Sequence, residues 1–193
     1  MIDILKKEIL ESIEVKQLLL DSSDDLKLIE ELVAECIKSL KNGGKIIFCG
    51  NGGSFADSQH LTAEFISKLR FDRSPLPAIA LGTNSSNLTA IGNDYGFEYI
   101  FERELIALHG ENDIFIPVST SGNSENIIRA INKANELGIK TYGLTGINRG
   151  KMDDLCNTIK VPSNKTEKIQ ECHIMIGHII CSLIENEIFH KPS

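Results

Sequence analysis

The segment STSGNS at residues 119–124 brings together four hydroxyl groups, an amide and a glycine. The apolar run 114–118 before it predicts a buried strand, and the apolar period of residues 124–137 after it predicts a helix. A loop that joins a strand to a helix N-terminus presents free backbone N–H groups, and the helix dipole favours an anion there. The segment therefore predicts a phosphate-binding site.

A simpler alternative is that Ser121 or Ser124 only caps the helix and that the rest is an ordinary loop. A cap accounts for one hydroxyl and not for four, so the phosphate site is favoured. No lysine follows the glycine where a Walker loop requires one, and no G-x-S-x-G nucleophile elbow occurs. A Ser-His-Asp hydrolase is therefore the least supported class of enzyme.

A second glycine-rich turn, GNGGS at 50–54, lies between a predicted strand at 45–49 and a predicted helix at 55–69. It fails the dinucleotide fingerprint because Phe55 stands where the third glycine is required. On this helix, His60 and Glu64 are four residues apart and share one side. They form either a surface pair worth about a few tenths of a kcal/mol or part of a functional site, which their closeness to the turn favours.

The last predicted helix, 166–189, places polar residues in an otherwise apolar pattern. Gln170 and His178 share a face of this helix. A single histidine on such a face is usually a hydrogen-bonded core residue, so structural and functional interpretations of His178 both stay open. His173 is interpreted as a core residue.

Strands are predicted at 45–49, 77–81, 114–118, 141–144 and 158–161, alternating with helices. This alternation indicates a single α/β domain, 1–193, with a five-stranded parallel sheet flanked by helices on both faces. Ligands bind at the carboxyl ends of such strands, where both polar turns fall. Residues 92–96 predict a polar turn between two short helices, and 149–156 a short helix.

Two amphipathic helices precede the first strand, and a Ser22-x-x-Asp25 capping box is expected to open the second. The first carries a narrow apolar stripe, typical of helix-on-helix packing. Residues 1–42 are therefore predicted to be a helical N-terminal extension at a subunit interface.

The chain has 193 residues and a formal net charge of −7, which argues against a nucleic-acid partner. The charged N-terminus predicts no signal peptide, and no uninterrupted apolar run approaches the roughly 20 residues of a membrane helix. Five cysteines form no C-x-x-C pair, and most lie in apolar runs, which indicates reduced thiols in a cytoplasm.

Five segments together resemble the SIS (sugar isomerase) domain and, within it, the phosphoheptose isomerase family: GNGGS, the His60/Glu64 helix, GNDYGF at 92–97, STSGNS, and IQECHIMIGH at 169–178. The resemblance covers nearly the whole chain. It implies a flavodoxin-like SIS fold and a homotetramer with sites at subunit interfaces. It also implies that Glu64 is the catalytic base and His178 the acid.

The resemblance further implies a Zn²⁺ ion held by His60, Glu64, Gln170 and His178. Gln170 and His178 are eight residues apart, about 12 Å along a helix, so both reach one ion only if the helix starts irregularly, if long side chains converge, or if subunits share the site. The implied contacts to the sugar phosphate are Asn51, Gly52, Gly53, Glu64, Asn93, Asp94, Ser119, Thr120, Ser121, Ser124 and Gln170.

The implied reaction is isomerisation of sedoheptulose 7-phosphate to D-glycero-D-manno-heptose 7-phosphate through an enediol, for bacterial lipopolysaccharide or capsule. Lys68 and Glu167 depart from the family, which often has Arg and Asp there, so another phosphosugar is an alternative substrate. A SIS-fold sugar-phosphate-binding regulator or replication-initiator adaptor is the alternative without catalysis. Glu64 together with His178 favours the enzyme, because a binder needs no acid–base pair.

Overall fold

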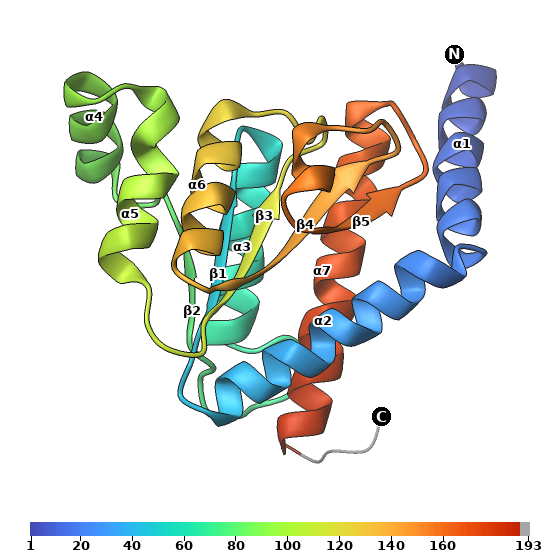
Figure 1. Ribbon diagram of the computed structural model, residues 1–193. Coiled ribbons are helices and arrows are strands. Elements are labelled where there is room, and N and C mark those ends of the chain that lie inside the picture. The colour runs from blue at the N-terminus through green and yellow to red at the C-terminus, as the bar shows by residue number, and fades with distance from the viewer. Residues whose placement is uncertain (190–193) are drawn as a thin grey trace.

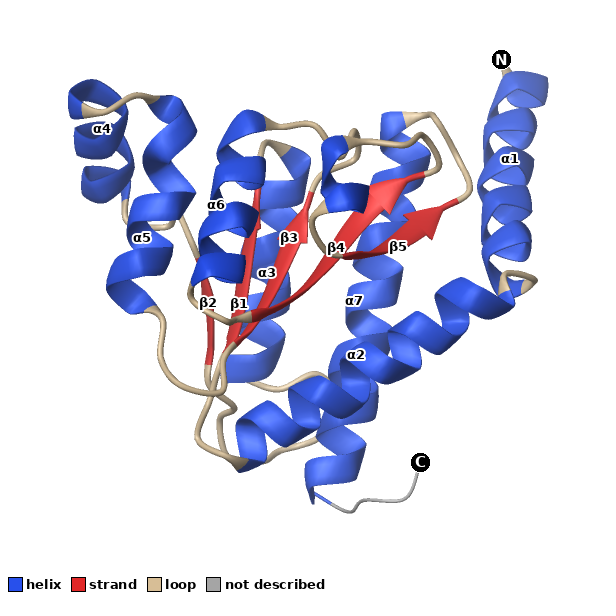
Figure 2. Ribbon diagram, in the orientation of Figure 1, coloured by secondary structure: helices blue, strands red, loops and turns tan. Residues whose placement is uncertain are grey.

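The computed structural model describes residues 1–189, which form a three-layer α/β/α sandwich (Figures 1 and 2). All five strands pair in parallel in the order β2-β1-β3-β4-β5. The strands are β1 (Ile46–Gly50), β2 (Ala78–Ala80), β3 (Ile114–Val118), β4 (Lys140–Gly146) and β5 (Asn157–Val161). The predicted flavodoxin-like α/β fold is confirmed, since this is the order of that class.

Helices cover both faces of the sheet. One core packs α2 (Ser23–Lys41), α3 (Gly53–Ile66) and α7 (Thr166–Phe189) on the sheet, and the other packs α5 (Ile100–Leu108) and α6 (Glu125–Glu136). The remaining elements are α1 (Ile2–Leu20), α4 (Ser85–Asp94), and the 3-10 helices η1 (Phe97–Tyr99) and η2 (Lys151–Asp154). β1 and β3 are buried along their whole length, which explains their uninterrupted apolar runs.

A glycine lets α3 and α7 approach each other closely. A Cβ built on Gly177 of α7 would lie 2.5 Å from the side chain of Leu61 on α3, which is 1% exposed. This contact falls between His60 and Glu64 on α3 and beside His178 on α7. The glycine is therefore the reason that polar groups from two helices can meet across this contact.

The apolar stripe on α1 does not pack on the rest of the chain. Val15 and Leu19 are buried, but Ile2, Ile9 and Leu20 are 67%, 61% and 62% exposed. Figure 1 shows α1 standing apart from the sheet at one edge of the molecule. Most of this helix therefore presents apolar surface that nothing in residues 1–189 covers.

The predicted capping box is wrong. Ser22 is the N-cap of α2, but its hydroxyl donates to the Asp25 carboxylate (2.5 Å) rather than accepting from the backbone. The other Asp25 oxygen accepts from the N–H of Lys160 in β5 (2.8 Å). The Asp25 carboxylate therefore bonds to β5 and to the Ser22 hydroxyl, and not to the backbone N–H of Ser22 as a capping box requires.

Three predicted boundaries also differ from the structure. Gly92, Asn93 and Asp94 form the last turn of α4, so the predicted turn at 92–96 shrinks to Tyr95 and Gly96. The helix predicted at 55–69 begins at Gly53 and ends at Ile66, and that predicted at 149–156 is only the short η2. Gly96 has a φ of 108°, and this left-handed residue is the real break in the chain.

By length and composition alone, α7 could cross a membrane, although no such run was expected from the sequence. Half of its most apolar window is buried inside the protein. Its buried residues belong to the same core as those of α2 and α3. One such helix is therefore weak support for a membrane span and is typical of a core helix.

Candidate active site

The turn at 50–54 follows β1, and the turn at 119–124 follows the neighbouring strand β3. The chain leaves β1 toward β2 on one side of the sheet and leaves β3 toward β4 on the other, so the two turns meet at the switch point where such folds bind ligands. Asn51 and Asn126 tie the turns together by two reciprocal amide hydrogen bonds of 2.9 Å. Within the described residues, neither Gly52 at the start of α3 nor Ser124 at the start of α6 caps its helix with a side chain. The capping alternative for Ser124 is therefore wrong, and N–H groups of both first turns stay available to an anion.

The segment 119–124 is held in shape by the loop that follows β4. Ser119 is buried, and its hydroxyl contacts that of Ser124 at 3.2 Å. The N–H of Met152 donates to the carbonyl of Gly122 (3.0 Å), whose φ is 63°. A small polar cavity of about 140 Å³ opens beside Thr120, lined in addition by Ser121, Asn148, Ser163, Asn164 and Thr166. Of these, only Thr120 and Ser121 were predicted from the sequence.

His60, Glu64 and His178 converge between α3 and α7. Their nearest ligand atoms all lie within 4.8 Å of one another. The Nε2 atoms of the two imidazoles are 2.8 Å apart, and Nε2 of His60 is 3.3 Å from Oε1 of Glu64. At most one proton fits between two imidazole nitrogens at this distance. The cluster can therefore share a proton or direct nitrogen lone pairs and a carboxylate oxygen at one metal ion.

Asp57 is a member of this site that the sequence analysis missed. It is half-buried, and its Oδ2 has no hydrogen-bond partner in the described part of the chain. Burial raises the pKa of its carboxyl, and the nearby His60 and His178 oppose that shift. Its position three residues before His60, on the same face of α3, was the signal that could have found it.

Gln170, the fourth predicted metal ligand, lies at the glycine-rich turn that precedes α3. Its amide packs on the glycine turn, so that a Cβ built on Gly53 would lie 2.5 Å from its Nε2. α7 is a continuous α-helix from Thr166, which rules out the irregular start considered above. Within one subunit, Gln170 therefore lies beside the turns at 50–54 and His178 lies with His60 and Glu64.

We predict that Gly53→Ala disturbs Gln170 rather than the fold. Gly53 has no left-handed backbone, and the atom in the way is the end of a flexible side chain. The melting temperature is expected to stay within about 3 °C of wild type, since one methyl group on an exposed turn costs little. The KM for a sugar phosphate is expected to rise about tenfold. Equal kinetics in the two proteins would contradict a role for Gln170 in binding.

Asn93 and Asp94 are not brought to this cluster. They lie exposed on the last turn of α4, where the Asn93 amide donates to the Asp94 carboxylate (2.8 Å). Figure 1 places α4 at the outer side of the molecule, beyond α5 and α6. In a single copy of the chain they therefore contribute nothing to the His60 site. Lys68 and Glu167, the two positions that differ from the family's usual residues, are also exposed.

A buried ion pair that the sequence did not indicate supports the segment after α3. Arg73 and Glu185 are 3% and 1% exposed and meet at 2.9 Å. Glu185 also accepts from the N–H groups of Leu69 and Arg70, and Arg73 donates to the carbonyl of Glu64 (2.7 Å). The pair therefore holds the end of α3, which carries Glu64, against α7.

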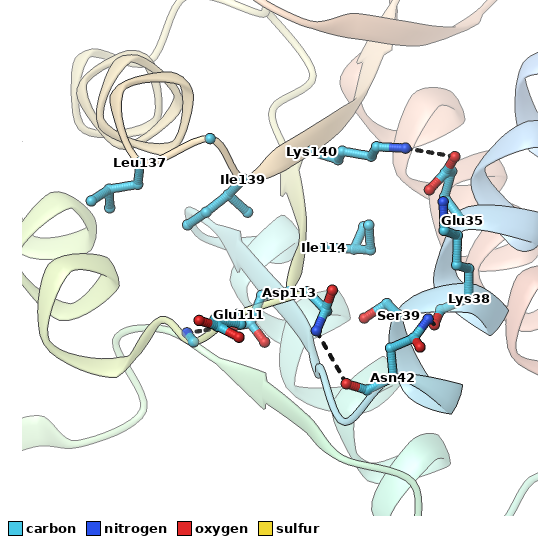
Figure 3. A pocket seen from close by; sticks show the side chains of 13 residues that line it. Glu35, Lys38, Ser39, Asn42, Glu111, Asp113, Ile114, Leu137, Ile139 and Lys140 are labelled. Carbon is cyan, nitrogen blue, oxygen red and sulfur yellow. Dashed lines mark hydrogen bonds and ion pairs between the residues drawn. The ribbon is translucent and has the colours of Figure 1, made fainter.

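Another hollow lies at the opposite end of the sheet, away from His60 and His178. It encloses about 270 Å³ at the amino ends of β1, β3 and β4. Figure 3 shows the Glu35 carboxylate pointing to the Lys140 ammonium, which it meets at 2.7 Å, and Asp113 is likewise paired with Lys45. Its charged groups are largely neutralised in pairs, whereas those around His60 converge.

The fold and this site define a class of protein. Residues 13–146 match the SIS domain family, so the chain is an SIS-domain protein. Within that class it belongs to the phosphoheptose isomerases, a family of enzymes. It is 53% identical to the phosphoheptose isomerase of Aneurinibacillus thermoaerophilus over 98% of this chain and 96% of the relative.

Solved structures agree with this assignment. A phosphoheptose isomerase from Francisella tularensis superposes with a TM-score of 0.90 at 35% identity, covering 96% of this chain and 98% of that one. The phosphoheptose isomerase of Neisseria gonorrhoeae superposes with a TM-score of 0.87 at 37% identity, covering 95% and 98%. The resemblance found in the sequence is confirmed.

Proposed function

We propose that the chain interconverts sedoheptulose 7-phosphate and D-glycero-D-manno-heptose 7-phosphate through an enediol. The convergence of His60, Glu64 and His178 carries the proposal, because a phosphate-binding protein without catalysis has no use for a carboxylate held against two imidazoles. Family membership supports the same reaction. The product would serve bacterial lipopolysaccharide or capsule synthesis in the cytoplasm.

The phosphate would anchor the substrate at residues 119–124, so that binding energy far from the reacting carbons orients them. The uncapped first turns of α3 and α6, with Ser119, Thr120, Ser121 and Ser124, supply the donors. Asn51, Gly52 and Gly53 would contact the sugar from the facing turn. No covalent intermediate is needed.

Glu64 would remove a proton from C1 of the ketose, which leaves an enediol, and would return it to C2. Its side chain is mostly buried, with 18% exposed, and the carboxylate lies 3.3 Å from Nε2 of His60, so it is held in place to take up a proton. His178 would exchange protons with O1 and O2. Since its Nε2 faces His60, a metal bound there would leave only Nδ1 to carry a proton.

The donor set of two imidazoles and a carboxylate fits Zn²⁺, with room for a substrate oxygen or a fourth ligand. When bound, the ion would polarise a substrate oxygen as a Lewis acid. We propose His60, Glu64 and His178 as its ligands in one subunit. Gln170, which lies two turns from His178, would reach the ion only by a change of side-chain position or from another subunit.

Metal removal provides a direct test of this site. The wild-type protein is expected to bind about one Zn²⁺ per subunit, because its three donors suit one ion. A chelator should abolish activity, and added Zn²⁺ should restore it. His60→Ala is expected to lose the stoichiometric metal, as measured by elemental analysis, whereas His109→Ala should keep it. Full activity after complete metal removal would contradict the proposal.

We also propose that the single domain 1–193 assembles into a homotetramer in which residues 1–42 pack on another copy. The exposed Ile2, Ile9 and Leu20 of α1 support this, because so much apolar surface on one helix is costly in water. Asn93 and Asp94 would then complete the site of a neighbouring subunit. Light scattering of wild type and of a deletion of residues 1–20 tests the assembly.

A substrate comparison tests the proposed function. Purified protein is expected to convert sedoheptulose 7-phosphate at least about tenfold more efficiently than fructose 6-phosphate or ribulose 5-phosphate, since a fixed phosphate anchor sets which carbons reach Glu64. A reversed preference would identify another phosphosugar isomerase, the alternative that Lys68 and Glu167 raise. Binding of all three without turnover by folded protein would support the regulator.

A further inference from the structure

His173 is a buried group for which the proposed chemistry has no use. It lies on α7 and is 1% exposed. Its Nε2 is 3.1 Å from the carbonyl oxygen of Thr145 in β4, so Nε2 must carry the proton and donate. Burial lowers the pKa of His173 to about 4, and the ring is therefore neutral at neutral pH. It is a fixed donor and not a proton carrier.

The strand end that accepts this hydrogen bond also holds the phosphate-binding segment. The N–H of Gly146, next to Thr145, donates to the carbonyl of Thr120 (3.2 Å). A Cβ built on Gly146 would lie 2.9 Å from that same oxygen and 2.6 Å from the side chain of Ile169 on α7. β4 therefore ends in a close-packed junction between α7 on one side and residues 119–124 on the other.

We propose that His173 is a positioning residue that sets the span between the phosphate anchor and the acid–base cluster. Its hydrogen bond to Thr145 fixes the position of α7 in the direction of the β4 axis, and α7 carries both Gln170 and His178. This inference rests on the proposed function, in which a substrate is held at its phosphate by residues 119–124 and reacts at Glu64 and His178. A fixed span is what such a two-point arrangement requires, since a misplacement of about 1 Å can cost about 100-fold in rate.

Core packing alone is the competing explanation, and it makes a different prediction. If His173 only fills space, an apolar residue of similar size should serve equally well. If the hydrogen bond to Thr145 matters, leucine should remove it and let α7 shift, whereas glutamine, whose amide N–H reaches about as far as Nε2, should keep it. Cys172→Ala, a neighbouring 1% exposed residue on α7, is the control for lost packing.

Kinetics of the full-length variants with sedoheptulose 7-phosphate give the first measurement. His173→Leu is expected to lower kcat about 10- to 100-fold while KM and the inhibition constant for inorganic phosphate change less than about threefold, because orientation rather than phosphate binding is lost. His173→Gln and Cys172→Ala should stay within about threefold of wild type. Wild-type kcat in folded His173→Leu, or equal losses in the leucine and glutamine variants, would overturn the inference.

Crystal structures of the same variants test the inference without relying on turnover. The leucine variant is expected to show α7 displaced along β4 relative to Gly146 and Thr120, with the glutamine variant superposing on wild type. An undisplaced α7 in His173→Leu would overturn the inference, even if the protein acts on another phosphosugar. Failure of wild type to turn over any ketose phosphate would instead count against the proposed function.

Discussion

Glu64→Gln is expected to lower kcat by about 10²- to 10⁴-fold, the range that a positioned general base contributes. Glutamine keeps the size and the hydrogen-bonding reach of glutamate but cannot accept a carbon-bound proton. The i,i+4 contact with His60 at 3.3 Å can persist as a hydrogen bond, so the loss should fall on kcat and the melting temperature should hardly change.

Glu136→Gln is the matched control, because Glu136 lies exposed at the end of α6, where it pairs with Lys133. Its kcat is expected to equal that of wild type. If Glu64→Gln retained more than a tenth of wild-type activity, another group would be the base. Asp57, whose buried Oδ2 is unpaired in the part of the chain described, would be the next candidate.

Glu185→Leu is expected to lower the free energy of unfolding by about 3–5 kcal/mol, the cost of leaving one charge of a buried pair uncompensated. The variant strands the Arg73 guanidinium, which is 3% exposed, and removes the acceptor for the N–H groups of Leu69 and Arg70. At about 2–4 °C per kcal/mol for a chain of this length, the melting temperature should fall by roughly 6–20 °C.

Urea denaturation measures this loss of stability. Glu136→Leu is the exposed control, and its free energy of unfolding is expected to fall by less than about 1 kcal/mol. The double variant Arg73→Met/Glu185→Leu should recover part of the stability, because an apolar pair of similar volume removes the stranded charge. A Glu185→Leu protein as stable as wild type would show that the pair does not hold the end of α3. Loss of activity without loss of stability would point to a direct role in the site.

The sequence was sufficient to predict the strands and the chemistry-bearing turns. Uninterrupted apolar runs and glycine-rich turns are local signals, and β1, β3 and the bounds of α7 follow them closely. His60 and Glu64 were visible for the same reason, as a spacing on one helix. The meeting of this pair with His178, more than 100 residues later in the chain, was supplied by the family resemblance and not by the spacing.

What the sequence did not predict depends on contacts between distant segments. Asp25 looked like half of a capping box, but one of its oxygens accepts from the N–H of Lys160, 135 residues away. The sequence analysis gave no role to Arg73 or Glu185, which pair only because α7 packs beside the segment that follows α3. His173 was correctly interpreted as buried, but its hydrogen bond to Thr145 requires knowing which strand α7 crosses. Local patterns carry none of this information.

The most direct test of the account is proton transfer at the sugar, followed by NMR in deuterated water with sedoheptulose 7-phosphate. We predict that wild-type protein forms an aldose heptose 7-phosphate with deuterium at C2, since a proton held on Glu64 can exchange with solvent before it returns to carbon. Glu64→Gln should form none. An aldose that carries no solvent deuterium, formed equally by wild type and by Glu64→Gln, would contradict the enediol route and the role of Glu64.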